Sequence, residues 1–271
     1  MKVARVFPTK TNMSPTDEHA YFDVPGLFTP KYDEVHISTT FTWDIPKAKY
    51  LAEAWREHGE VRVGGPAFGD PGGEFMPRMY LKPGVTITSR GCPNKCGFCF
   101  VPKREGEIRT LKIKTGNIIQ DNNLLACPKD HIFNVFEMLK SQTAIEFQGG
   151  LDVDYITEEI AQALSELKIK QLFLAYDYGR LRRRSLVNAV DKLSRHFSRD
   201  KIRCFVLIGY GDDTLEKAEV RLKDAWEIGT LPFAMLFKDE NKTEHYWEWR
   251  QLQRRWSRPA ITKSLAGVSS S

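Results

Sequence analysis

Three cysteines, Cys92, Cys96 and Cys99, stand within eight residues of this chain, in the run SRGCPNKCGFCFVPKREG. A cubane iron–sulfur cluster normally takes four thiolates. Three thiolates in C-x3-C-x2-C spacing hold three irons and leave the fourth iron open to bind a small molecule. The spacing therefore predicts a four-iron cluster with one coordination site for a ligand.

Two other uses of cysteine compete with this interpretation. Structural zinc favours four Cys or His ligands, often in C-x2-4-C pairs, and the sequence has no second pair. Cys127 or His131 could complete a tetrahedron, but both lie far along the chain, and Cys204 sits in the apolar run RCFVLIG, where cysteine behaves as a small hydrophobe. Disulfides are less favoured still, because five cysteines is an odd count and the start MKVARVFPTK lacks the apolar core of a secretory signal. We expect a cytoplasmic protein.

The composition, 41% hydrophobic and 28% charged over 271 residues, is that of an ordinary globular protein. No apolar stretch approaches the roughly 18 residues that span a bilayer, so we expect no membrane role. The net charge is a mild +5, and the basic residues gather at 182–184 and 250–258. These clusters leave nucleic acid open as a partner, although such runs on helices usually form solvated faces.

From Gly84 onward, short apolar runs alternate with amphipathic helical patterns, which indicates βα units around a parallel sheet. The expected strands are 84–88, 117–120, 144–148, 171–176, 203–209 and 232–237. The expected helices carry apolar faces over 132–139, 156–167, 186–197 and 215–225, with a last helix over 244–256 that would close the edge of a barrel. Periodicity leaves both a doubly wound sheet and a barrel possible.

The aromatic Phe98, directly before the last cysteine, sharpens the motif. With it, the chain resembles the radical S-adenosylmethionine (SAM) superfamily, whose signature is this cysteine spacing with an aromatic at this position. The resemblance implies a partial (β/α)6 barrel over 81–258, with the cysteine loop after its first strand. The segment 101–116 is basic and interrupted by glycine, so we expect a shortened first helix there.

The resemblance also implies the chemistry. A 4Fe-4S cluster and SAM would be the cofactors, and reductive cleavage of SAM would give a 5′-deoxyadenosyl radical that removes a hydrogen atom from an unidentified substrate. The partner would be a one-electron donor of flavodoxin or ferredoxin type. No residue of the chain is identified for the hydrogen transfer itself.

Residues 1–80 read as strands over 2–7, 33–39 and 60–65 and a helix over 45–59. They resemble an incomplete Rossmann-like, cobalamin-binding-like domain, which precedes the barrel in the radical SAM branch that includes methylthiotransferases. The run from Asp17 to His19 is superficially similar to a cobalamin-ligand fingerprint, D-x-H-x-x-G, but Phe22 replaces the glycine. We therefore expect no bound cobalamin. Residues 259–271 read as a C-terminal tail.

Ligands of parallel sheets gather at the carboxyl ends of the strands. By the order of strands in the family, Asp121 and Asn122 would accept from the SAM ammonium. The pair Gly149 and Gly150, after Gln148, competes for this role and would otherwise allow close backbone approach to SAM or substrate.

Later strands deliver further candidates. Tyr176 and Asp177 match the fourth-strand position near the ribose or carboxylate of SAM, and Gly209 opens a turn that would lie beside the adenine. Arg180 and Arg182 are candidate carboxylate donors, with a surface role as the alternative.

Two hypotheses from other classes remain. The chain could be a non-catalytic iron–sulfur or zinc-binding protein, or its radical chemistry could modify tRNA or another nucleic acid through the two basic clusters.

Overall fold

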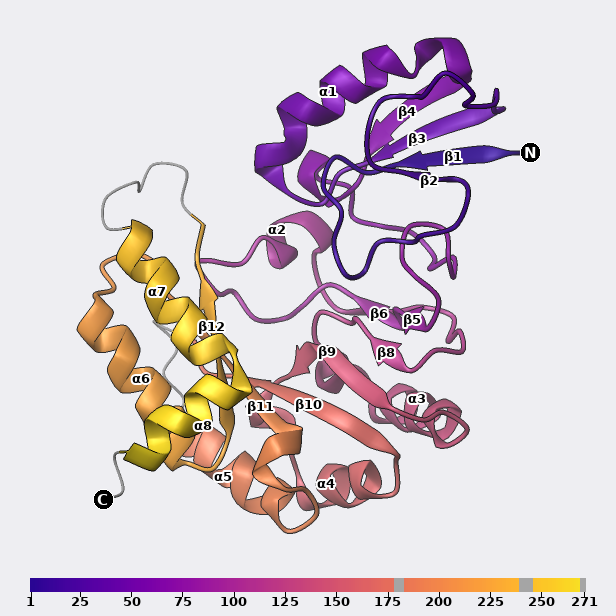
Figure 1. The fold of residues 1–271 in the computed structure, drawn as a ribbon. Helices are drawn as coiled ribbons and strands as arrows, with labels where there is room; N and C mark the ends of the chain where they lie inside the picture. Colours follow the sequence, from indigo (N-terminus) through magenta and orange to yellow (C-terminus); the bar gives the residue numbers. More distant parts are fainter. Residues whose placement is uncertain (178–182, 239–245, 269–271) are drawn as a thin grey trace. The chain divides into compact units, whose positions relative to one another are not determined.

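A computed structural model describes residues 1–177, 183–238 and 246–268 of the chain. The chain divides into two compact units (Figure 1). The smaller comprises residues 1–95 and 100–116, and the larger comprises residues 96–99 and the chain from Asn117 onward. Both contain parallel sheets, so the α/β class predicted from the sequence is confirmed. Within the described ranges, no helix combines the length and apolar character needed to cross a bilayer.

The larger unit is built on parallel strands in the spatial order β12-β11-β10-β9-β8. Their bounds are β8 (Ile118–Ile119), β9 (Ile145–Leu151), β10 (Ile169–Ala175), β11 (Ile202–Ile208) and β12 (Leu231–Leu236). The strands follow one another across the sheet in sequence order. Right-handed crossovers between them therefore place the connecting helices on the same face.

These connecting helices are α3 (Lys129–Lys140), α4 (Glu158–Ser165), α5 (Arg183–Ser194) and α6 (Leu215–Glu227). Their buried faces contain most of the apolar positions that the sequence periodicity predicts, and α6 also buries Arg221. Threonine side chains cap two of them: Thr157 accepts from the N–H of Ile160, and Thr214 accepts from that of Lys217. Local sequence signals thus set both the starts and the buried faces of these helices.

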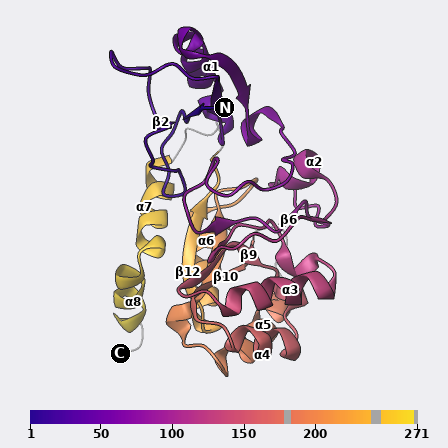
Figure 2. The ribbon, with the colours of Figure 1, turned by 90° about the vertical axis from the view of Figure 1, so that its right-hand side faces the viewer.

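Helix α7 (Tyr246–Ser257) lies along β12, the last strand of this sheet (Figures 1 and 2). Leu252 and Trp256 are buried, and the Ser257 hydroxyl donates to the carbonyl of Ala234 on the strand at 3.1 Å. A helix close to the predicted range 244–256 is therefore confirmed, and it packs on β12. Residues 259–268, part of the expected tail, instead form helix α8 (Pro259–Val268).

Strand β9 differs from the expectation in length. The sequence predicts its end at residue 148, whereas the strand continues to Leu151. Its pairing with β10 shifts register between Phe147 and Leu151, and Gly150 takes a positive φ of 88° within the shift. Gly149 and Gly150 therefore form a bulge inside the strand rather than a loop after it.

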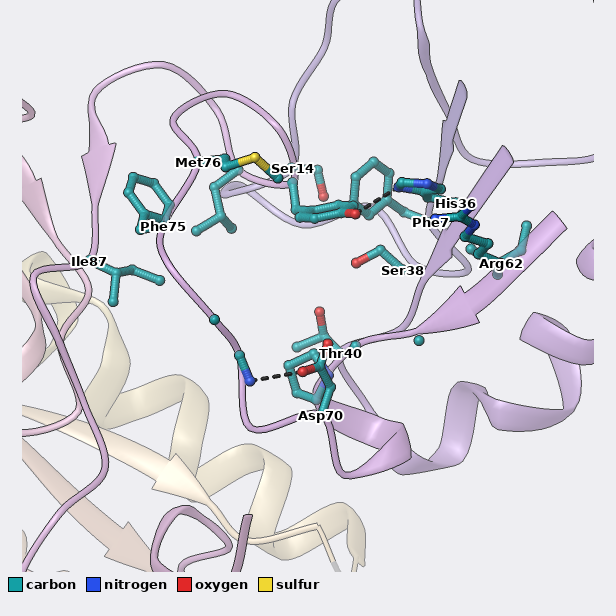
Figure 3. Close-up of a pocket in the computed structure, with 18 of the residues that line it drawn as sticks. Phe7, Ser14, His36, Ser38, Thr40, Arg62, Asp70, Phe75, Met76 and Ile87 are labelled. Carbon is teal, nitrogen blue, oxygen red and sulfur yellow. Dashed lines mark hydrogen bonds between the residues drawn. The ribbon is translucent and has the colours of Figure 1, made fainter. Parts of the chain in front are cut away.

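The smaller unit contains the parallel sheet β2-β1-β3-β4. Its strands are β1 (Val3–Val6), β2 (Ala20–Tyr21), β3 (Glu34–Ser38) and β4 (Glu60–Gly64), of which β2 falls in a segment expected to be loop. The unit also contains β5 (Val85–Thr86), β6 (Ser89–Arg90), β7 (Arg109–Thr110) and the short helix α2 (Val101–Glu105). The carboxyl ends of β1, β3 and β4 border a cavity (Figure 3).

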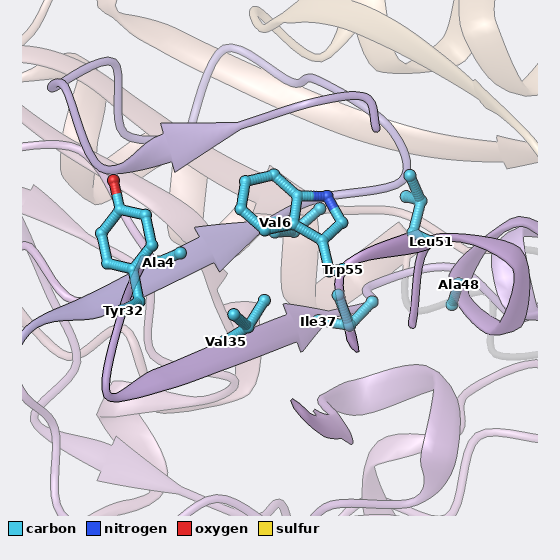
Figure 4. Close-up of a cluster of buried hydrophobic side chains, with 8 residues drawn as sticks. All are labelled: Ala4, Val6, Tyr32, Val35, Ile37, Ala48, Leu51 and Trp55. Atoms are coloured by element: carbon cyan, nitrogen blue, oxygen red, sulfur yellow. The ribbon is translucent and has the colours of Figure 1, made fainter. Parts of the chain in front are cut away.

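Helix α1 (Ile45–Ala54) packs on this sheet around Trp55, which is fully buried (Figure 4). The cluster joins strand residues to the helix: Ala4, Val6, Tyr32, Val35, Ile37, Ala48, Leu51 and Trp55. The indole N–H of Trp55 donates to the carbonyl of Asp23 at 3.1 Å, so its one polar group is satisfied. Burial of this aromatic side chain is the largest single apolar contribution in the cluster.

Candidate functional site

Cys92 belongs to the smaller unit, where it follows the antiparallel pair β6–β7. Its N–H donates to the carbonyl of Gly106 at 3.1 Å. The preceding Gly91 has φ 80°, and a Cβ there would lie 2.1 Å from the carbonyl oxygen of Glu107. The backbone just before Cys92 therefore passes so close to the segment at Glu107 that only glycine fits at position 91.

Cys96 and Cys99 belong to the larger unit and stand at the two ends of a tight turn. The N–H of Cys99 donates to the carbonyl of Cys96 at 3.0 Å. Both side chains are half-exposed. The turn therefore carries one partly exposed thiol at each end, three positions apart in the chain.

The aromatic residue of the cysteine motif packs on the end of strand β11. The rings of Phe98 and Tyr210 meet edge to face, with centroids 5.7 Å apart. A Cβ at Gly97 would lie 2.9 Å from the Tyr210 hydroxyl oxygen, so the loop is also closely approached at its glycine. Tyr210 in turn contacts Phe237 after β12. Within the larger unit, residues distant in sequence thus bring the segment 96–99 to the carboxyl ends of parallel strands.

The turn that carries Tyr210 is anchored by a buried ion pair. Gly209 (φ 78°) donates its N–H to the Asp213 carboxylate at 2.9 Å. That carboxylate, fully buried, also accepts two hydrogen bonds from Arg221 on α6, at 2.6 and 2.9 Å. Arg221 additionally donates to the carbonyl of Leu207. These bonds fix the backbone of the turn before any ligand binds.

The loop after β8 holds the candidate Asp121, whose side chain is 1% exposed, and the half-exposed Asn122. Gly149 of the bulge passes directly beside it: a Cβ at Gly149 would lie 1.8 Å from the carbonyl oxygen of Asp121. Asn123 donates to the Asp152 carboxylate at 3.1 Å, which ties this loop to the segment after β9. The two segments that compete for the ammonium role are therefore adjacent.

Other candidates have partners within the protein. The amide of Gln148 donates to Glu146, which also accepts from Lys170. The Tyr176 hydroxyl donates to Asp224 on α6 at 2.8 Å. Burial, together with this bond, raises the pKa of Tyr176 far above its usual range.

Of the candidates after β10, the structure describes Tyr176 and Asp177. The hydrogen bond to Asp224 directs the Tyr176 hydroxyl toward the helix, whereas Asp177, the next residue, is half-exposed. Arg180 and Arg182 lie outside the described residues.

The other two cysteines are buried, and burial raises the pKa of the Cys204 thiol. The interpretation of Cys204 as a core residue is confirmed. In the described part of the chain, no three or more His, Cys, Asp and Glu side chains form a group arranged to hold a metal ion. Cys92, Cys96 and Cys99 are each partly exposed, and thiolates suit soft metals and iron–sulfur clusters.

Neither a scan against protein-family models nor a search of curated proteins finds a match for this chain.

The sequence did not point to Tyr210 or to the pair Asp213–Arg221. The sequence does contain a signal for Tyr210, because it is an aromatic residue between two glycines at the end of a predicted strand. The ion pair joins residues eight positions apart. Its burial depends on how α6 packs, which the sequence pattern does not reveal.

Proposed function

We propose that this chain is a radical SAM enzyme, which reductively cleaves S-adenosylmethionine at a 4Fe-4S cluster and abstracts hydrogen from an unidentified substrate. The observation that carries the proposal is the C-x3-C-x2-C motif together with the contact of its aromatic, Phe98, on Tyr210. That contact joins the cysteine loop to the carboxyl end of a parallel strand, where such folds bind ligands. The proposal includes a partial (β/α)6 barrel over residues 81–258.

Cys92, Cys96 and Cys99 would hold the cluster in this proposal. When bound, the cluster and SAM would supply the redox chemistry, the one-electron reductive cleavage of SAM that provides the hydrogen-abstracting radical. The protein fixes the thiols, orients the ligand and excludes water. An external one-electron donor of flavodoxin or ferredoxin type would supply the electron.

We assign the SAM contacts to three segments of the larger unit. Asp121 and Asn122, beside the bulge at Gly149, would accept from the ammonium. Asp177 would contact the ribose hydroxyls, since the Tyr176 hydroxyl is held by Asp224.

The third segment is the turn after β11. The pre-formed backbone from Gly209 to Gly211 would lie beside the adenine, with Phe98 as its aromatic neighbour. Because Asp213 and Arg221 already fix this turn, little ordering would be required on binding.

The test is anaerobic reconstitution with iron and sulfide, followed by electron paramagnetic resonance of the reduced protein with and without SAM. We expect about four irons per chain, as in one cubane cluster, a signal that changes on adding SAM, and formation of 5′-deoxyadenosine. Cys92→Ala, Cys96→Ala and Cys99→Ala should each abolish the SAM response. Cys204→Ala is the matched control and should keep it, because this thiol is buried.

Stoichiometric zinc, or a cluster that SAM does not perturb, would refute the proposal. Either result would leave a non-catalytic metal-binding protein as the function.

A further inference from the structure

The cavity of the smaller unit lies outside the site proposed above, and all its lining residues belong to residues 1–95 (Figure 3). Its volume is about 550 Å³, within the roughly 300–1,000 Å³ of small-molecule sites. Phe7 follows β1, Ser38 ends β3 and Gly64 ends β4, so the cavity borders the carboxyl ends of three parallel strands. Open α/β sheets bind ligands at this edge.

The two ends of the cavity differ in chemistry. Phe75, Met76 and Ile87 form an apolar end, and the hydroxyl groups of Ser38 and Thr40 lie toward the opposite side (Figure 3). A ligand that fits both ends has an apolar, planar part and a part rich in hydrogen-bonding groups.

The charged lining residues already have polar partners within the protein, and Glu74 accepts from the backbone N–H of Lys112 at 3.3 Å. Arg62 pairs with Glu34 at 2.8 Å and with Glu60 at 3.2 Å. Asp70 accepts from the N–H of Gly72 at 2.8 Å, and Arg90 lies 3.9 Å from Glu105. A charged ligand would have to displace these partners, so the cavity favours an uncharged one.

Glu34, His36 and Tyr80 form a chain of hydrogen bonds, which fixes the Tyr80 hydroxyl at the cavity. His36 bonds through one ring nitrogen to Glu34, which is 8% exposed, at 2.6 Å, and through the other to the Tyr80 hydroxyl at 2.7 Å. Both nitrogens are occupied, so His36 is not poised as a metal ligand. Burial, together with the carboxylates of Asp70 and Glu34, raises the pKa of Tyr80 and keeps its hydroxyl neutral. A hydroxyl can make more than one hydrogen bond, which leaves Tyr80 able to bind a ligand as well.

We propose that this cavity binds an uncharged nucleoside. The base would lie at the end formed by Phe75, Met76 and Ile87, and the ribose hydroxyls would bond to Ser38, Thr40 and Tyr80. Nucleosides combine a planar ring, several hydroxyls and no net charge, and they are small enough for a cavity of about 550 Å³. The inference does not depend on the proposed radical chemistry, since it uses neither the cysteines nor the larger unit.

Two substitutions separate binding in this cavity from binding elsewhere. Tyr80→Phe removes the hydroxyl and keeps the ring. Gly64→Val adds a side chain where a Cβ would have no atom within 4 Å and where φ lies outside the left-handed region, so the fold tolerates it while the cavity loses space. Tyr50→Phe is the matched control, because Tyr50 is 62% exposed on α1 and does not line the cavity.

The experiment is titration of the full chain with adenosine and with uridine, followed by isothermal calorimetry and saturation-transfer NMR. We expect saturable binding of at least one nucleoside, a roughly three- to tenfold loss of affinity in Tyr80→Phe, loss of binding in Gly64→Val, and no change in Tyr50→Phe. Adenosine 5′-monophosphate should bind more weakly than adenosine. Melting curves of each variant establish that it is folded.

Three results would overturn the proposal: no saturable binding of either nucleoside, affinity unchanged in Gly64→Val, or tighter binding of the monophosphate. Adenosine held at a SAM site in the larger unit would give the second result. The failure of this inference and the failure of the radical SAM proposal are therefore distinguishable.

Discussion

Replacing Asp213 by alanine should destabilise the larger unit strongly. The Asp213 carboxylate is fully buried, and the Arg221 guanidinium that it binds in a bidentate pair is 6% exposed. Removing one partner of a buried ion pair costs about 3–5 kcal/mol, because the other charge keeps its desolvation penalty. The Gly209 N–H would lose its acceptor as well. We expect a loss of about 3–5 kcal/mol in the free energy of unfolding.

The second arm of this prediction is the double variant Asp213→Ala/Arg221→Met. It removes both charges and fills the space with an apolar chain, so it should recover about half of the loss or more. Urea unfolding of the apoprotein measures the stability of all three proteins. Hydrogen exchange locates the change, which should affect peptides over 202–236 and leave those over 1–64 unaltered. A cost under about 1 kcal/mol for the single variant, or a double variant no more stable than it, would refute the reasoning.

The remaining predictions concern separate features. Gly149→Ala should lower the melting temperature and abolish the SAM response, because its Cβ would lie 1.8 Å from a backbone oxygen, whereas Gly64→Ala, with nothing within 4 Å, should leave melting unchanged. Trp55→Ala should cost about 3–5 kcal/mol in urea unfolding, since the side chain is fully buried. Arg203→Met should raise stability by about 1 kcal/mol or more, because the arginine is 6% exposed, two of its nitrogens have no hydrogen-bond partner among the described residues, and burial lowers its pKa; a loss of stability would contradict this. We expect the basic residues over 250–258 to form a solvated face and retention on RNA to stay slight, whereas strong retention that falls steeply with salt would indicate nucleic acid as a partner.

The sequence predicted the elements whose signals are local. The strand–helix alternation from residue 117 onward follows from periodic apolar positions, and the larger unit contains each of those helices. The expected short helix after the cysteines is α2, which ends at Gly106. Local propensity and burial agree in these segments, so pattern alone sufficed.

Elements that depend on distant partners were missed. Ala20–Tyr21 is a strand only because it pairs with β1, and nothing in two residues signals this. Strand β9 was ended too early because Gly149 and Gly150 read as a loop, although pairing with β10 carries the strand through the bulge to Leu151. The C-terminal helix was read as a tail, although Pro259 is favourable at the first position of a helix.

At the candidate site too, the sequence indicated the motif residues but not the contacts that hold them. The sequence singled out the cysteine motif through the types and spacing of its residues, and the resemblance to the radical SAM superfamily added Phe98 and Gly209. It could not indicate that Tyr210 meets Phe98 or that Asp213 fixes the turn, since both contacts depend on how β11 and α6 pack. These supporting contacts, and not further ligands, are what the structure adds to the motif.

Such supporting contacts determine how much of a ligand's binding energy is spent on ordering the protein. At the turn after β11 the backbone is held by a buried carboxylate, and at Gly149 it is held by close packing against a neighbouring loop. Glycine weakens a strand, and a buried ion pair is in general no more stabilising than well-packed apolar side chains, so stability alone explains neither feature. Rigid backbone at the carboxyl edge is, by contrast, what a site needs in order to position a ligand within fractions of an ångström. The local energetic cost at this edge is therefore an argument for a binding function there, independent of the cysteine motif.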